Sequence, residues 1–148
     1  MFEIESKSPD DITIITKKTT INFNITDAVI DAGLPVGKIT GPGEFEIGDA
    51  TIRGIATESG KTIYDIEIGG VHVGILGGIE EGLDDIVADI LCTSSVRAVR
   101  EIEPKLVVSM GNVDAMVTEL KLTARTEKKL KVKNLDSLPA TKEVIVLN

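Results

Sequence analysis

The sequence predicts an α/β (α+β) fold of mixed β-sheets with flanking helices. The chain of 148 residues is 42% hydrophobic but only 3% aromatic, so isoleucine, valine and leucine must make its core, which is typical of β-rich proteins. The first half contains almost only strand-like patterns, whereas the second half alternates helix-like and strand-like patterns. These observations favour either a sheet with helices on one face or two stacked sheets.

In the first half, the pattern of residues 12–25 predicts a β-hairpin that places Ile21, Phe23 and Ile25 on one face. Residues 26–40 are rich in glycine and proline and have no clear period, so we expect a connection with a short helical turn at residues 27–32. Further strands are predicted at residues 44–47, 51–56, 62–68 and 71–76, and the pair Gly69-Gly70 permits a two-residue hairpin between the last two.

In the second half, the residues Leu83, Ile86, Val87 and Ile90 have the spacing of a buried helical stripe, although residues 88–92 could instead form a short buried strand. Ser94 or Ser95 can cap a helix with the apolar stripe Val96, Val99 and Ile102, and Pro104 ends it. A strand at residues 105–110 follows, and Asn112 can then cap a second helix with the stripe Val113, Met116, Val117 and Leu120. Residues 130–133 and 143–147 are expected to be closing strands.

Charge and cysteine content exclude several classes of partner. A net charge of −8 repels phosphates and anionic lipids at long range, so we expect no binding to nucleic acid or to a membrane surface. The lysines at positions 128, 129, 131 and 133 alternate with apolar residues and indicate a solvated strand face.

The sequence also predicts the location and the number of domains. One cysteine, no leader pattern and no spanning apolar run predict a cytoplasmic protein. The absence of a linker predicts a single domain over residues 1–148.

An ordered series of short motifs resembles the metallo-β-lactamase superfamily, in particular its ascorbate-6-phosphate lactonase-like branch. The similarity is strongest over residues 41–148, and its motifs are Gly41-Pro42-Gly43-Glu44-Phe45-Glu46, Lys61-Thr62-Ile63-Tyr64-Asp65-Ile66-Glu67-Ile68, Gly70-Val71-His72-Val73, Ile75-Leu76-Gly77-Gly78 and Ile102-Glu103-Pro104-Lys105-Leu106-Val107-Val108-Ser109-Met110-Gly111. The resemblance implies a sandwich of two mixed sheets flanked by helices, here shortened. It also implies one or two metal ions that activate water for hydrolysis.

The metal-ligand residues that the resemblance implies are replaced in this sequence. No histidine lies between Ile25 and Gly41, where the family has its His-x-His-x-Asp-His motif. Gly78 stands where the family has a bridging aspartate, Ile75 where it has a nearby histidine, and Gly111 where it has a late histidine ligand. Because zinc is held by imidazole, thiolate and carboxylate groups, we expect no metal and no cofactor at these positions.

The remaining candidates for a site are carboxylates and one imidazole. If a site exists, Glu44, Glu46, His72, Asp84 and Asp85 are its candidate residues, but a single histidine in a strand is more typical of an ordinary surface position. The acidic run Glu80, Glu81, Asp84, Asp85 and Asp89 matches no calcium loop and is interpreted as a solvated face. Cys92 is interpreted as a buried structural residue.

Three functional hypotheses follow from the sequence. The leading one is a catalytically inactive, metal-free domain with an interaction or assembly role. We expect it to form a homodimer that covers apolar surface or a strand edge left open by the shortened N-terminal half. The second is a metal-dependent hydrolase of a small phosphorylated or lactone-like substrate with a carboxylate-rich site. The third is a small-molecule sensor that performs no catalysis.

Overall fold

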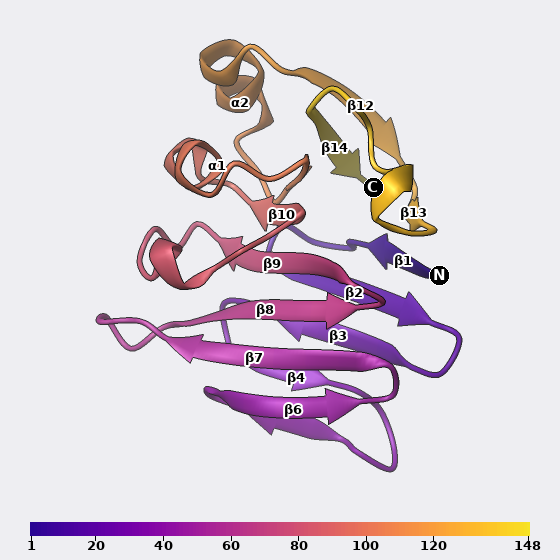
Figure 1. Cartoon of the computed structure of the whole chain (residues 1–148). Helices are drawn as coiled ribbons and strands as arrows, with labels where there is room; N and C mark the ends of the chain where they lie inside the picture. The colour runs from indigo at the N-terminus through magenta and orange to yellow at the C-terminus, as the bar shows by residue number, and fades with distance from the viewer.

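The computed structural model describes residues 1–148, which form two β-sheets packed face to face (Figure 1). The first sheet has six antiparallel strands. In spatial order they are β13 (Leu130–Val132), β1 (Phe2–Glu5), β2 (Asp11–Thr16), β3 (Thr20–Asn24), β4 (Val29–Asp31) and β5 (Lys38–Thr40).

The second sheet has eight strands and is mixed. In spatial order they are β12 (Thr123–Glu127), β14 (Glu143–Leu147), β11 (Leu106–Ser109), β10 (Ile90–Thr93), β9 (Val71–Gly77), β8 (Thr62–Ile68), β7 (Ala50–Ala56) and β6 (Gly43–Ile47). Strands β6 to β9 form antiparallel hairpins, whereas the pairs β9–β10, β10–β11, β11–β14 and β14–β12 are parallel. The predicted mixed-sheet α+β sandwich is therefore confirmed.

Alternating aliphatic residues create the main core between the two sheets. In β3, for example, Ile21 and Phe23 are fully buried while Asn22 between them faces outward. A cluster of 24 buried residues, drawn from both sheets, fills this space. Tyr64 on β8 and Phe23 on β3 pack against each other across it, with ring centroids 5.4 Å apart.

The helices α1 (Val96–Ile102) and α2 (Val113–Leu120) cover the outer face of the parallel half of the second sheet (Figure 1). A second cluster of 12 buried residues lies beneath them. Helix α1 connects the parallel strands β10 and β11, as such crossovers require. Short 3₁₀ turns η1 (Leu83–Asp85) and η2 (Leu135–Ser137) complete the structure, and no helix is long and apolar enough to cross a bilayer.

The chain passes from one sheet to the other three times. Gly41 and Pro42 connect β5 to β6, Lys128 and Lys129 connect β12 to β13, and residues 133–142, which include η2, return the chain to β14. Gly54 allows the first crossing to approach β7 closely, because a Cβ atom there would lie 3.4 Å from Pro42 Cα. The crossings leave the outer edges of β5, β6, β12 and β13 without a strand partner.

Most elements predicted from the sequence are present, including the hairpin at residues 12–25, the four following strands, and both closing strands. Lys131 is exposed in β13 between buried Leu130 and Val132, and exposed Lys129 and Lys133 flank the strand, so the alternation is as predicted. Ser95 caps α1, since its hydroxyl accepts a hydrogen bond from the amide of Ala98 at 3.0 Å. Cys92 is buried.

Three expectations about local structure were wrong. Residues 26–40 contain the strands β4 and β5 rather than a helical turn, because Ile30 is drawn into the core and pairs with Ile39. The apolar stripe from Leu83 forms only the 3₁₀ turn η1, after which the chain is extended and Val87 is 70% exposed. The alternative of a short buried strand at residues 88–92 is the better one, since β10 is a buried strand that begins at Ile90. Asn112 precedes α2 but does not cap it, and its side chain instead donates to the carbonyl of Ser94.

Candidate functional site

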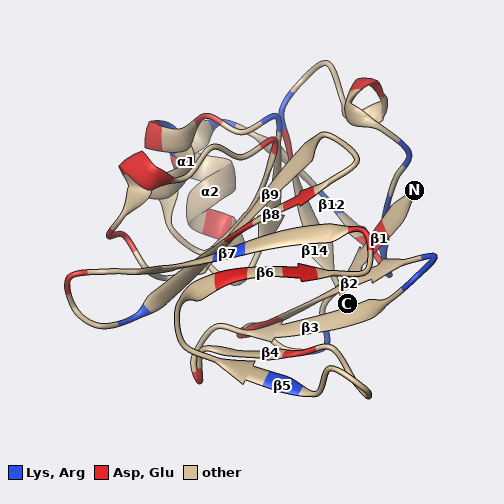
Figure 2. Cartoon of the chain, turned by 60° about the horizontal axis from the view of Figure 1, so that its bottom comes forward, with Lys and Arg blue, Asp and Glu red and all other residues tan.

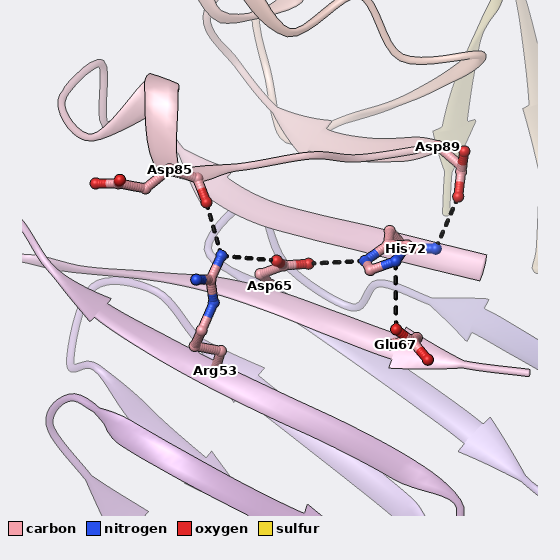
Figure 3. Close-up of polar contacts among 6 residues, drawn as sticks. All are labelled: Arg53, Asp65, Glu67, His72, Asp85 and Asp89. Atoms are coloured by element: carbon pink, nitrogen blue, oxygen red, sulfur yellow. Dashed lines mark hydrogen bonds and ion pairs between the residues drawn. The ribbon is translucent and has the colours of Figure 1, made fainter. Parts of the chain in front are cut away.

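A polar cluster lies on the outer face of the antiparallel half of the second sheet. Strand alternation turns Arg53 of β7, Asp65 and Glu67 of β8, and His72 of β9 away from the core. The strand register places Arg53 opposite Asp65 and Glu67 opposite His72. Figure 3 shows these four side chains in one connected group.

Asp65 is the centre of this cluster, with a side chain only 11% exposed. Its Oδ2 atom lies 3.0 Å from Arg53 Nη2, and its Oδ1 atom lies 3.5 Å from His72 Nδ1. The same Arg53 Nη2 donates to the carbonyl of Asp85 at 2.7 Å, which ties η1 to the sheet (Figure 3). The carboxylate therefore joins three strands and, through Arg53, the loop that follows them.

His72 is held at each of its polar groups. Its Nε2 atom lies 3.3 Å from Glu67 Oε2, so the imidazole bridges two carboxylates. Its backbone amide donates to Asp89 Oδ2 at 2.9 Å, which fastens the chain just before β10 (Figure 3). Because both ring nitrogens already face protein oxygens, the arrangement is that of a structural contact between strands.

The other carboxylates proposed from the sequence lie near this cluster but do not join it. Glu44 and Glu46 are exposed on β6, on the same face as Arg53, and the register sets Glu44 opposite Arg53. Figure 2 shows the acidic residues of β6 in red, beside β7. Asp84 and Asp85 are exposed on η1, and the carboxylate of Asp85 points away from Arg53 (Figure 3). Nowhere in residues 1–148 do three or more His, Cys, Asp or Glu side chains gather in a group able to hold a metal ion.

The acidic run between β9 and β10 forms hydrogen bonds that organise the loops. Glu80 accepts a hydrogen bond from Ser95, the cap of α1. Glu81 accepts from the amide and hydroxyl of Ser59, and these bonds, with the hydroxyl of Ser59 the largest cause, lower the pKa of Glu81. Asp89 holds the amide of His72. The interpretation as a merely solvated face therefore misses the structural role of these three residues.

A second region contains the positions at which the resemblance implies metal ligands. Gly78 follows β9 and Gly111 follows β11, and both lie beside Ser94, which follows β10. A Cβ atom at Gly78 would lie 3.3 Å from Ser94 Oγ, and one at Gly111 would lie 3.8 Å from Ser94 Cβ. Positions far apart in the sequence thus converge at the ends of three parallel strands.

The residues in this region do not fit a zinc ion. Gly78 and Gly111 have no side chain, and the hydroxyl of Ser94 does not belong to the imidazole, thiolate and carboxylate groups that bind zinc in proteins. Gly111 has a φ angle of +122°, which an L-residue such as histidine rarely adopts, so the backbone itself is unsuited to a ligand there. Ile75 lies in the main core rather than at the strand ends.

Cys92 of β10 lies in the core beside this region and is fully buried. Burial raises the pKa of the Cys92 thiol, so the reactive thiolate is suppressed at neutral pH. We expect the native protein to resist thiol-specific reagents at neutral pH and to react at its single cysteine once unfolded in guanidinium. Rapid labelling of the native protein would contradict the buried position.

Sequence reasoning missed the central residues of the polar cluster, Arg53 and Asp65. Both lie in segments that were predicted as strands, and alternation along those strands would have placed them on the outer face. The missing information was the register between β7, β8 and β9, because that pairing brings Arg53 and His72 to the same carboxylate.

Comparison with known proteins identifies the fold. A scan against protein-family models finds no match, and a search of curated proteins finds none either. Among solved structures, the chain is similar to a candidate zinc-dependent hydrolase of the metallo-β-lactamase superfamily from Thermotoga maritima, with a TM-score of 0.72 and 15% sequence identity. The match covers 99% of this chain and 98% of that chain, so it includes the N-terminal strands that the sequence motifs did not reach. The protein therefore has a metallo-β-lactamase-like fold.

Proposed function

We propose that this protein is a catalytically inactive, metal-free domain of metallo-β-lactamase-like fold with an interaction or assembly role as a homodimer. The observation that carries the proposal is the convergence of Gly78, Ser94 and Gly111 at the strand ends, where a hydrolase of this kind needs metal ligands. The lone imidazole, His72, lies on the outer face of the sheet and is engaged by Asp65 and Glu67.

The carboxylate-based hydrolase has less support from the geometry. Activation of water by a metal requires several ligands that converge and leave one position open. Glu44 and Glu46 lie on β6, while Asp84 and Asp85 lie on η1, and these groups do not form a metal-binding arrangement. We expect added Zn²⁺ or Mn²⁺ to leave the melting temperature unchanged. A metal ion that bound the native state would instead stabilise it, by about 2.7 kcal/mol at a concentration 100 times its Kd.

Open strand edges and one exposed apolar turn support the dimer. The outer edge of β5 has no strand partner. Leu34 and Val36, in the turn that precedes β5, are 94% and 49% exposed. Exposed apolar side chains beside an open edge are a feature that association with a second copy would cover.

Light scattering coupled to gel filtration tests the dimer. We expect the wild-type chain to elute with the mass of two chains, and the double variant Leu34→Glu, Val36→Glu to elute as a monomer, because charges would have to be buried at the contact. Val87→Glu is the matched control, since Val87 is 70% exposed and lies elsewhere on the surface. A wild-type monomer at all accessible concentrations would contradict the homodimer.

A further inference from the structure

Hydrogen bonds at both ends of the β4–β5 pair show how the backbone of β5 is oriented. The amide of Ala32 donates to the carbonyl of Gly37 at 3.0 Å, and the amide of Gly41 donates to the carbonyl of Ala28 at 3.3 Å. Hydrogen-bonded and non-hydrogen-bonded pairs alternate along antiparallel strands. The register of the two strands therefore leaves one hydrogen-bonded pair between these ends, at the middle residue of β5.

That middle residue is Ile39, which is bonded to Ile30 of β4 and packs its side chain against the main core. The residues on either side, Lys38 and Thr40, are in non-hydrogen-bonded pairs with β4. Their N–H and C=O groups point to the outer edge of the first sheet, where β5 is the last strand (Figure 2). The backbone groups of both residues thus have no strand partner.

A second copy of the chain can pair with this edge in a register that uses all of these groups. In an antiparallel arrangement about a twofold axis at Ile39, Lys38 of each chain lies opposite Thr40 of the partner subunit. Each such pair exchanges two N–H···O=C bonds, and no two like charges lie opposite each other. The two Ile39 residues form the non-hydrogen-bonded pair at the axis, with their side chains close together on the inner face of the sheet.

The open edges of β6 and β13 are less suited to such pairing because their charges would repel. The same arrangement about the middle of β6 would set Glu44 opposite Glu46 of the partner subunit. About the middle of β13, it would set the two Lys131 residues opposite each other. Charged side chains of this kind are a common protection of edge strands against association.

The open edge of β12 offers little apolar surface to a second copy, in contrast to β5. The charges of Arg125 and Glu127 are already paired within the chain, and β12 has no large apolar side chain. Strand β5 has a single charge, on Lys38, and the turn before it exposes Leu34 and Val36. Of the four open edges, β5 therefore combines a self-complementary register with apolar side chains that association would cover.

We propose that the homodimer forms by antiparallel pairing of β5 with β5 of the second copy, which joins the two six-stranded sheets into one continuous sheet. The proposal rests on the homodimer proposed above and specifies its contact. Backbone hydrogen bonds of Lys38 and Thr40 set the register of the two chains. Leu34 and Val36, in the turns that flank the paired strands, add apolar area to these bonds.

The variant Thr40→Pro tests the pairing on the full chain. It removes an N–H that β4 does not use, and proline is tolerated at the outer edge of a sheet. In the dimer each chain loses one hydrogen bond that it donates, so we expect the dissociation constant measured by analytical ultracentrifugation to rise at least about tenfold. Thr40→Ala is the matched control, because it keeps the N–H, and its dissociation constant should equal that of the wild type. An unchanged circular dichroism spectrum shows that each variant is folded.

Disulfide formation locates the twofold axis. Non-hydrogen-bonded residues on antiparallel strands have Cα atoms about 4.5 Å apart, which a disulfide can span. Mild oxidation of Ile39→Cys is therefore expected to link most chains into covalent dimers on a non-reducing gel. Lys38→Cys is the matched control and should stay mostly unlinked, because its two thiols would belong to diagonal neighbours about 7–8 Å apart. The native Cys92 is buried and does not contribute.

The outcomes separate this contact from the homodimer itself. A wild-type chain that stays monomeric in light scattering would contradict the homodimer and, with it, the pairing. The homodimer would stand, but the pairing through β5 would be overturned, if the wild type is dimeric, Thr40→Pro dissociates no more readily, and Ile39→Cys links no faster than Lys38→Cys.

Discussion

Replacement of Asp65 by alanine is expected to lower the free energy of unfolding by about 1–2 kcal/mol. The change removes the 3.0 Å ion pair with Arg53 and leaves His72 Nδ1 without its carboxylate. Asp65 is 11% exposed, so water replaces the lost contacts of its carboxylate poorly. Arg53 is 44% exposed, so solvent screens the ion pair and limits the loss of stability. Urea denaturation of the two proteins measures the difference.

Two further variants separate the contacts of Asp65 from its charge. Asp65→Asn keeps an acceptor oxygen for Arg53 but loses the ion pair, so its stability should lie between those of the wild type and the alanine variant. Glu44→Ala is the control, because Glu44 lies opposite Arg53 on the same face but its side chain makes no hydrogen bond, and its effect should stay within about 0.5 kcal/mol. Equal effects of Asp65→Ala and Glu44→Ala would show that the cluster does not stabilise the sheet.

Replacement of Tyr64 by phenylalanine is expected to raise the free energy of unfolding by about 1–2 kcal/mol. The Tyr64 side chain is fully buried against Phe23, and its hydroxyl has no hydrogen-bond partner. A buried polar group without a partner keeps the cost of its desolvation, and phenylalanine preserves the ring without that cost. For a chain of this size the melting temperature should rise by roughly 2–8 °C. A less stable variant would mean that the hydroxyl is bonded in solution.

Alkaline titration provides an independent check on Tyr64. Burial raises the pKa of Tyr64 above its ordinary value of 10.0, so the neutral phenol is favoured in the folded state. The resulting contribution to stability is complete below pH 10.0 and is lost as the pH rises towards the folded-state pKa. The chain has one tyrosine, so tyrosinate absorbance reports on this residue alone and should appear together with unfolding. Ionisation at pH 10.0 in the folded protein would contradict the burial.

The sequence predicted the strands and helices whose signals lie within a few neighbouring residues. The hairpin that contains Ile21 and Phe23, and the helix capped by Ser95, follow from alternation, apolar spacing and capping within a few residues. Strand β12 could not be predicted in this way, because four of its five residues are exposed and it has no apolar alternation. The helix expected at Leu83 failed because tertiary packing buries Ile86 and Ile90 from an extended chain and leaves Val87 in solvent.

Sites depend on pairings between strands that the sequence does not display. The absence of ligand side chains at Gly78 and Gly111 was predicted from the resemblance, but only the structure brings both positions to Ser94 and gives Gly111 a φ angle of +122°. The position of His72 between Asp65 and Glu67 likewise requires the register of β8 against β9.

The most direct test of the proposed loss of hydrolytic chemistry is metal analysis of protein purified without chelators and without a metal-binding tag. Elemental analysis should count zinc, iron and manganese per chain. We expect only small fractions of an equivalent, because Gly78, Ser94 and Gly111 supply no imidazole or carboxylate at the strand ends. A near-stoichiometric content of any of these metals, lost in a His72→Gln variant, would contradict the proposal and favour the hydrolase instead.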